Sequence, residues 1–571
     1  METERSSDAV NQRRLDSLRR GRGPIAEHVI DEFVAGRLTR REFLRRGTAV
    51  GLSMPLLGAL LRAGGVVSPR MPSSASSSSA KAGATIRAGI LTPAGAINPI
   101  TSDDPGGSQI IGQVSEWLVF TDENFNYHPW LASSWSPNAD ATVWTFNLQK
   151  SAKFSDGTPM TADDVVYSFQ TQTNPKTGGA ALSVFSGLLV PDGVVKVDDY
   201  TVALHLEVPD ANFVDAVSPD NFNMVIVPNG YDYSNYQSEM LGTGRFVKTG
   251  FTPNVGATFI RNPNYWGTPA LPATLEFTFY AGEVPMTAGL EAGNIDCNGS
   301  FSVATSPQLL SGGFNVIAVR ESAHRELSMR NDLPPFTNKY VRQALALTLD
   351  RPAIVKALFK GYAEVGNDSP FASIFKATVG PPAVPQRTQN LKLAKELLAK
   401  AGVPRGFSAP LFTEEYEECA EFAQIIKSSA AQVGVDISLN VETETKYFGS
   451  STIGSSDWLD GEMSLVAYGA RAVPNVFLEA PLQTYNKKTG QGAWNAARFN
   501  NATYDKLSKD YVAAVDLSSQ RALAKQIEVL LLDETPIIYA YFYDGLFATQ
   551  KNVHGVYPTV FQLFLWNAWK S

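Results

Sequence analysis

The sequence predicts an α/β protein built from several lobes. Segments that alternate apolar and polar residues with period two, as strands do, are interleaved with segments whose apolar residues recur three or four positions apart, as in helices. A chain of 571 residues exceeds what one hydrophobic core usually serves. No repeat of fixed period follows residue 84, which disfavours solenoids and propellers.

Three segments carry the clearest strand pattern. Residues 85–91 and 142–148 are predicted to be half-buried sheet strands, and residues 435–441 alternate in the same way after a helical segment. That helical segment is stopped by Gly402 and Pro404, which end a helix for conformational and steric reasons. Helices that alternate with strands predict a sheet with helical covers.

Helices are predicted from caps and from amphipathic spacing. Thr161 and Asp164 can accept the free N–H groups of a first turn, so a helix is expected over residues 162–169. Six further helices are predicted from apolar residues three or four apart. They are residues 341–349, 353–359, 391–401, 418–433, 504–514 and 521–532.

Composition and charge exclude some classes of protein. The chain is 44% hydrophobic and 18% charged, as globular proteins are. Residues 1–84 contain 14 Lys and Arg against 8 Asp and Glu, which leaves 34 basic and 48 acidic residues, a net charge of -14, for the remainder. Because such a body repels phosphate backbones, no nucleic-acid partner is expected.

The N-terminal segment is predicted to be an address. Residues 39–45 read Thr-Arg-Arg-Glu-Phe-Leu-Arg and precede a short apolar run, which resembles a twin-arginine export signal. Residues 73–79 are typical of a flexible linker, and Ala82 and Ala84 offer a cleavage site, so residues 1–83 are interpreted as signal and Ser-rich linker. We expect the product at a periplasmic or extracytoplasmic surface.

One set of motifs favours an enzyme as the alternative. Ser373 and Lys376, then residues 438–440, then Lys488-Thr-Gly490 reproduce in order the elements of penicillin-recognising serine acylases. Pro370 and the glycine and prolines at 380–382 confine a helix there to about two turns. The Lys-Thr-Gly tripeptide also recurs twice elsewhere, so chance is the better account.

No cofactor or metal is predicted. The five histidines are isolated, and none shows the spacing that turns two imidazoles toward one metal. Cys297 and Cys419 lie far apart in sequence, outside any C-x-x-C pair, and their disulfide status stays open.

Four stretches in order resemble the family 5 extracellular solute-binding proteins, the peptide- and nickel-type substrate-binding proteins of bacterial ATP-binding-cassette (ABC) importers. The first, Ala152-Lys-Phe-Ser-Asp-Gly-Thr-Pro-Met-Thr-Ala-Asp-Asp to Phe169, resembles the family signature. The second joins Gly242-Thr-Gly-Arg-Phe to Arg261-Asn-Pro-Asn-Tyr-Trp-Gly. The third is Glu291-Ala-Gly-Asn-Ile-Asp, and the fourth runs from Pro334 to Arg351.

The resemblance implies a two-lobed periplasmic-binding-protein clamshell, of class II or cluster C type, with an extra inserted subdomain. Lobe I is expected from residues 84–128, 223–330 and 536–571, the inserted subdomain from 129–222, and lobe II from 331–535. A monomer of this kind captures a small solute between its lobes and delivers it to the permease of an ABC importer, without a chemical step. An importer-independent sensor is a further alternative.

The resemblance also suggests a ligand loop at residues 466–477, where relatives place an aromatic residue and an Asp that holds a peptide's amino terminus. Tyr468 keeps the aromatic residue, but Val473 stands before Pro474 where Asp is usual, which puts an ordinary peptide ligand in doubt. If Arg471 points inward and not to the surface, it favours a solute with an anionic group. Three further candidates for ligand contact are Trp494, Asn495 and Asn98.

Overall fold

The computed structural model describes residues 83–450 and 452–571. The predicted twin-arginine signal and Ser-rich linker, including Ala82, lie outside the described residues, so the export route stays a prediction. The chain divides into residues 1–78 and 79–571, and all of the described residues belong to the second unit. No described helix is both long and apolar enough to cross a membrane.

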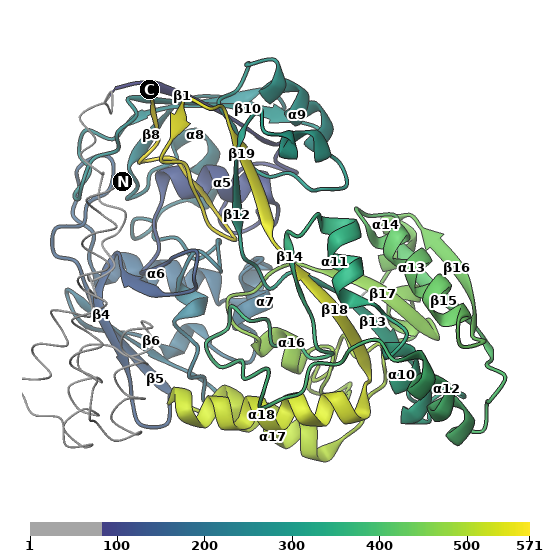
Figure 1. The fold of residues 1–571 in the computed structure, drawn as a ribbon. Coiled ribbons are helices and arrows are strands. Elements are labelled where there is room, and N and C mark those ends of the chain that lie inside the picture. The colour runs from purple at the N-terminus through teal and green to yellow at the C-terminus, as the bar shows by residue number, and fades with distance from the viewer. Residues whose placement is uncertain (1–82, 451) are drawn as a thin grey trace, which may run out of the picture. The chain divides into compact units, whose positions relative to one another are not determined.

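A seven-stranded mixed sheet forms the first layer (Figure 1). The central strand β1 (Thr85–Leu91) runs parallel to both of its neighbours. Its alternating burial confirms the strand predicted there, and helices α5 (Pro105–Val114) and α9 (Glu283–Glu291) contact it. In spatial order the other strands are β12 (Asn315–Val319), β19 (Gly545–Thr549) and β11 (Cys297–Asn298) on one side and β10 (Thr274–Tyr280), β9 (Gly256–Arg261) and β8 (Phe246–Thr252) on the other.

A separate four-stranded sheet lies within the predicted inserted subdomain. Its antiparallel order is β4 (Ala132–Pro137), β5 (Val143–Leu148), β7 (Thr201–His205) and β6 (Val194–Asp198). Helix α6 (Ala162–Gln172) packs on β6 and β7. The predicted capping box is present, and Asp164 also accepts a hydrogen bond from the Asn229 N–H at 2.8 Å. The first family stretch therefore fixes α6 to the chain that leaves the subdomain.

A six-stranded sheet carries the helix-rich half of the chain. Its strands are, in order, β14 (Ala363–Val365), β18 (Ile537–Tyr543), β13 (His324–Met329), β17 (Met463–Tyr468), β15 (Ser408–Glu414) and β16 (Asp436–Glu442). The helices predicted for this half are confirmed, with small differences at their ends. They are α10 (Lys339–Ala346), α11 (Arg351–Phe359), α12 (Leu391–Lys400), α13 (Cys419–Ala431), α17 (Ala502–Ala513) and α18 (Leu517–Glu534).

Several short elements complete the described part. They are strands β2 (Val119–Thr121), β3 (Tyr127–Pro129), β20 (Val553–His554), β21 (Tyr557–Pro558), β22 (Leu563–Phe564) and β23 (Trp569–Lys570), and helices α7 (Leu182–Phe185), α8 (Tyr236–Glu239), α14 (Glu444–Phe448), α15 (Asp457–Asp460) and α16 (Asn475–Glu479).

Strand pairing moves the predicted lobe boundaries. We call the seven-stranded and four-stranded sheets with their helices lobe I, and the six-stranded sheet with its helices lobe II. Strands β13 and β18 both pair within the six-stranded sheet, although boundaries near residues 330 and 535 had assigned both to lobe I. The chain instead crosses between the lobes at residues 320–323 and at Asp544, because the buried, apolar β18 completes the lobe II core.

The second family stretch holds a buried ion pair together. The Glu116 carboxylate accepts hydrogen bonds from the Tyr265 hydroxyl at 2.7 Å and the Trp266 indole at 3.1 Å, and it pairs with Arg245 at 3.3 Å. The Arg245 guanidinium lies over the ring of Trp566 at 4.3 Å. Because a buried charge needs this many partners, the motif has a structural role.

The third and fourth stretches end in similar pairs. Asp296 binds Arg87 at 2.8 Å and Lys570 at 2.7 Å, so it joins β1 to the C-terminal strand. Arg351 donates two hydrogen bonds, of 2.8 and 2.9 Å, to the fully buried Asp368, which also pairs with Arg387. These motif residues stabilise the lobes and do not line the cavity described below.

Candidate functional site

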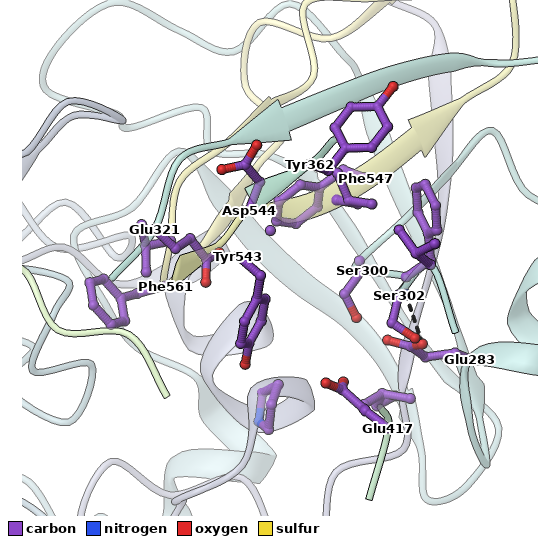
Figure 2. A pocket seen from close by; sticks show the side chains of 18 of the residues that line it. Glu283, Ser300, Ser302, Glu321, Tyr362, Glu417, Tyr543, Asp544, Phe547 and Phe561 are labelled. Carbon is purple, nitrogen blue, oxygen red and sulfur yellow. Dashed lines mark hydrogen bonds between the residues drawn. The ribbon is translucent and has the colours of Figure 1, made fainter. Parts of the chain in front are cut away.

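A cavity of about 370 Å³ lies between lobe I and lobe II. Lobe I contributes the start of α5, the loop at residues 299–304 and the C-terminal segment 559–562, while lobe II contributes residues 358–362 and 416–418. Figure 2 shows side chains from both lobes pointing toward the same space. This volume is within the range of about 300–1,000 Å³ that holds small organic ligands.

Aromatic rings form much of the cavity wall. They are Phe222, Phe301, Phe359, Tyr362, Tyr416, Tyr543, Phe547 and Phe561. The rings of Phe359 and Tyr543 stack with an interplanar angle of 3° and centroids 5.7 Å apart, and the Arg325 guanidinium lies over the Tyr543 ring, 4.7 Å from its centroid. Such rings offer flat apolar faces and favourable positions for a cation.

The charged side chains of the cavity wall are all acidic. The described residues that line it include no Lys, Arg or His. They include seven carboxylates, which are Asp103, Asp104, Glu283, Glu321, Glu417, Glu418 and Asp544. An electrostatic field of one sign in a partly enclosed space favours a solute of the opposite charge.

Four of these carboxylates already have partners. Glu417 and Glu418 bind the buried Arg325 at 2.8 and 3.0 Å. Glu283 accepts a hydrogen bond from the Ser302 N–H at 2.9 Å and another from the Thr305 hydroxyl, and Asp104 caps α5. A fifth carboxylate, Asp103, is exposed to solvent.

Glu321 and Asp544 lack such partners. Neither carboxylate forms a hydrogen bond or an ion pair within the described part of the chain, although both line the cavity (Figure 2). Burial raises the pKa of Glu321 well above its usual value and raises the pKa of Asp544 to about 6. The nearby Arg320 guanidinium opposes the shift at Asp544, whereas Asp544 and Glu417 add to the shift at Glu321.

The predicted ligand residues lie outside the lining of this cavity. Tyr468 and Trp494 are brought together, with ring centroids 5.9 Å apart, and Tyr468 also stacks on His324. The fully buried side-chain amide of Asn495 donates hydrogen bonds to the backbone carbonyls of Gln483 and Phe499. The side-chain amide of Asn98 donates to the Tyr233 carbonyl. These two amides shape their own loops, and ligand contact by Asn495 or Asn98 stays a prediction.

Two carboxylates of the chain itself supply negative charge near Arg471. Its Nη1 donates to the Ala470 carbonyl at 2.8 Å, and its backbone is bonded in both directions to Ser322. Burial lowers the pKa of the Arg471 guanidinium, while the carboxylates of Asp215 and Asp220 from lobe I raise it. Binding of a solute by Tyr468, Arg471 or Trp494 stays a prediction.

The serine acylase arrangement does not form. Ser373 lies in a turn and not at a helix start, where its N–H donates to the Glu364 carboxylate at 2.6 Å and its hydroxyl donates to the same group. Lys376 points over the ring of Tyr127, at 6.0 Å from the centroid. Residues 487–490 form a turn closed by the bridge from Asn486 to Gln491.

Comparison with known proteins decides the family. The sequence model of the bacterial extracellular solute-binding proteins, family 5 Middle, matches residues 126–491. The chain belongs to this family. Family 5 relatives include heme-binding protein A of Haemophilus influenzae, 26% identical over 477 residues that cover 77% of this chain and 82% of the relative. The periplasmic murein peptide-binding protein MppA of Escherichia coli is 27% identical over 462 residues, which cover 76% and 83%.

Solved structures confirm the predicted family 5 fold, two-lobed and of the periplasmic-binding-protein type. HbpA2 from Haemophilus parasuis has a TM-score of 0.74 at 24% identity, covering 85% of this chain and 100% of that chain. The murein tripeptide-binding protein of Escherichia coli has a TM-score of 0.66 at 23% identity, with coverage of 86% and 98%. The relatives are named as binding proteins, which agrees at the family level with the prediction of a non-enzyme.

Sequence reasoning missed Glu321 and Asp544. Each stands beside an apolar strand, and the two positions face each other only because β12 pairs with β19 in antiparallel register. The predicted lobe boundaries hid this signal, since Glu321 was placed inside lobe I and Asp544 at a distance from any crossing. The signal available in the sequence was an acidic residue within two positions of the end of β12 and of β18, the strands that lead into the two crossings.

Proposed function

We propose that the chain captures a small solute in the cavity between lobes I and II and delivers it to the permease of an ABC importer at the outer face of the membrane. Membership of a solute-binding family supports capture. Delivery, a monomeric state and export by the twin-arginine route are parts of the proposal. Closure around the solute requires contacts that form only when the two lobes meet.

The solute that fits this cavity carries a positive charge. The observation that carries this proposal is the wall itself, which combines seven carboxylates with aromatic rings and has no basic side chain among the described residues. The fold does not set the ligand, because similar structures are described in complex with a peptide, with Ni(L-His) and with agropinic acid.

A solute with an anionic group is the second candidate, and Arg471 alone favours it. Its guanidinium would grip a carboxylate or phosphate if the loop turned it toward a ligand. Asp215 and Asp220 already supply negative charge at that position, so the cation is better supported.

Mass spectrometry of the protein purified from its exported form, under conditions that preserve complexes, tests the class of solute. We expect a co-purified organic cation that is small enough to fit the cavity volume of about 370 Å³. A co-purified anion, retained by the wild type and lost in Arg471→Ala, would establish the second candidate instead.

Two further assays separate the remaining functions. Uptake of the identified solute by cells with and without the neighbouring permease genes distinguishes an importer receptor from a sensor, because only the receptor requires the permease. A serine-reactive probe addresses the acylase alternative: stoichiometric labelling of Ser373 would restore that alternative, and we expect none because Lys376, the base which that arrangement requires, points over the ring of Tyr127.

A further inference from the structure

The two segments that join the lobes lie side by side. The first comprises residues 320–323 between β12 and β13, and the second is Asp544 between β18 and β19. On the lobe I side Val319 pairs with Gly545, and on the lobe II side His324 pairs with Phe542. Strand ladders therefore hold the two crossing segments next to each other at both ends.

Each crossing segment carries one carboxylate that lines the cavity. Glu321 comes from the first and Asp544 from the second, and Figure 2 shows both side chains at the cavity wall. The Glu321 carboxylate packs directly against Gly545, where a methyl group would lie 2.0 Å from its Oε1. Glu321 is thus fixed beside the residue that follows Asp544.

These carboxylates differ from the others in the cavity. The remaining buried or partly buried carboxylates are bound to Arg325, to the 302–305 loop or to the N-terminus of α5. The charged groups that face Asp544 are Arg320, Glu364 and Glu321, and those that face Glu321 are Asp544 and Glu417. Arg320 donates its 3.4 Å hydrogen bond to Ser373 and none to Asp544. Two carboxyl groups therefore meet at the crossing, and no basic side chain within the described part of the chain is bonded to either.

We propose that Glu321 and Asp544 together form the cation subsite of the cavity, and that they take an ammonium, amidinium or guanidinium group of the solute. This proposal rests on the proposed function, and it adds the atoms that select the ligand. A planar, delocalised cation can donate to both carboxylates at once. Each carboxylate belongs to a different crossing segment. Binding of the cation therefore depends on how the two crossing segments are arranged.

Three probes of equal size and different charge test the proposal. They are benzamidine, benzamide and benzoate, with charges of +1, 0 and -1, and their affinities for the full chain are measured by calorimetry or ligand-observed NMR. We expect benzamidine to bind at least about tenfold more tightly than benzamide, with a dissociation constant below about 10 mM. We expect Glu321→Gln and Asp544→Asn each to lower benzamidine affinity about tenfold and to change benzamide affinity less than about twofold.

Two control variants locate the effect. Glu291→Gln removes an exposed carboxylate of α9 outside the cavity, and Glu417→Gln removes a cavity carboxylate that is already bound to Arg325. We expect Glu291→Gln to change benzamidine affinity less than about threefold. Glu417→Gln, which weakens the acidic wall, should lower it less than the crossing variants do. Unchanged benzamide binding and circular dichroism show that each variant folds.

The possible results separate the two proposals. If the wild type prefers benzamidine but Glu321→Gln and Asp544→Asn bind it as well as the wild type, Glu321 and Asp544 (the crossing pair) are not the cation subsite. The proposal of a cationic solute is then retained. A loss in Glu417→Gln as large as in the crossing variants also overturns the pair, because the whole acidic wall is then responsible. If the wild type binds benzamidine no better than benzamide or benzoate, the cationic solute and the crossing pair are both overturned.

Discussion

Asp544 makes the affinity for a cation depend on pH. Its pKa is raised to about 6 by burial, and a bound cation lowers that pKa because it favours the carboxylate. Linkage then requires affinity to fall as pH decreases through about 6 and, because the pKa of Glu321 is raised as well, to keep rising above that pH. We expect benzamidine binding to weaken about tenfold between about pH 7 and pH 5, with proton release measurable by calorimetry in buffers of different ionisation enthalpy.

Asp544→Asn should remove the step near pH 6 from that profile, since the amide does not titrate. Glu291→Gln, outside the cavity, should retain the wild-type profile. A profile in Asp544→Asn that matches the wild type would assign the pH dependence to another group.

Gly545 is required by the position of Glu321. A methyl group at residue 545 would lie 2.0 Å from the Glu321 Oε1, so Gly545→Ala must displace that carboxylate. We expect benzamidine affinity to fall about tenfold, as in Glu321→Gln, with benzamide affinity preserved. Gly282→Ala is the matched control, because its methyl group meets no atom within 4 Å. Equal affinities in both variants would show that Glu321 can move without loss of binding.

At the scale of elements, the buried carboxylate of Asp368 joins three parts of lobe II. It binds Arg351 at the start of α11, Arg387 in the following loop, and the Tyr539 N–H of β18 at 3.2 Å. Asp368→Ala leaves two guanidinium groups without their carboxylate, which costs about 3–5 kcal/mol for a buried pair. We expect a corresponding loss in the free energy of unfolding, measured by denaturant titration.

Asp436→Asn, at an exposed position at the start of β16, is the control for Asp368→Ala and should change stability by less than about 0.5 kcal/mol. A loss below about 1 kcal/mol in Asp368→Ala would mean that water or other groups replace the missing carboxylate.

The same elements show how far the sequence could be interpreted. Helices such as α12 and α18 follow from local periodicity and caps, because those signals are contained within the segment itself. The lobe boundaries near residues 330 and 535 were misplaced, because β13 and β18 are apolar strands that could complete either sheet. Their pairing is a long-range property that no local pattern contains.

The candidate site is less predictable than the elements for the same reason. Tyr468 and Trp494, predicted as separate candidates for ligand contact, lie against each other, whereas the cavity wall is assembled from segments as distant as Asp103 and Phe561. Only the fold reveals that Glu417 and Glu418 enclose Arg325 and face the cavity.

At the scale of the whole described unit, a second contact joins the lobes away from the crossing segments. The Asn212 amide donates to Asn475 at 3.0 Å, the Ala211 N–H donates to the Val512 carbonyl at 3.0 Å, and Gln520 donates to Asn212 at 3.2 Å. Three carboxylates accompany this contact, at Asp210, Asp215 and Asp220. Both side-chain oxygens of Asp220 are buried without a hydrogen-bond partner within the described part.

The buried carboxylates at this contact should make the stability of the protein fall as pH rises. Burial raises the pKa of Asp210 to about 7, and it raises the pKa values of Asp215 and Asp220 as well. Between about pH 4 and pH 7 the folded chain therefore binds more protons than the unfolded chain, so the free energy of unfolding decreases across this window. The stabilisation is complete below the unfolded pKa and is lost above the folded one.

Asp210→Asn isolates this effect, because the amide oxygen can still accept the 2.8 Å hydrogen bond from the Asn212 N–H and the 3.4 Å bond from Asn475. We expect the free energy of unfolding of the variant, measured by denaturant titration, to exceed that of the wild type at pH 8 by up to about 4 kcal/mol and to match it near pH 4. Asp192→Asn, an exposed substitution in the same subdomain, should follow the wild type at both values. If the Asp210→Asn and wild-type curves instead run parallel across the window, Asp210 is ionised without cost and the contact between the lobes does not bury its charge.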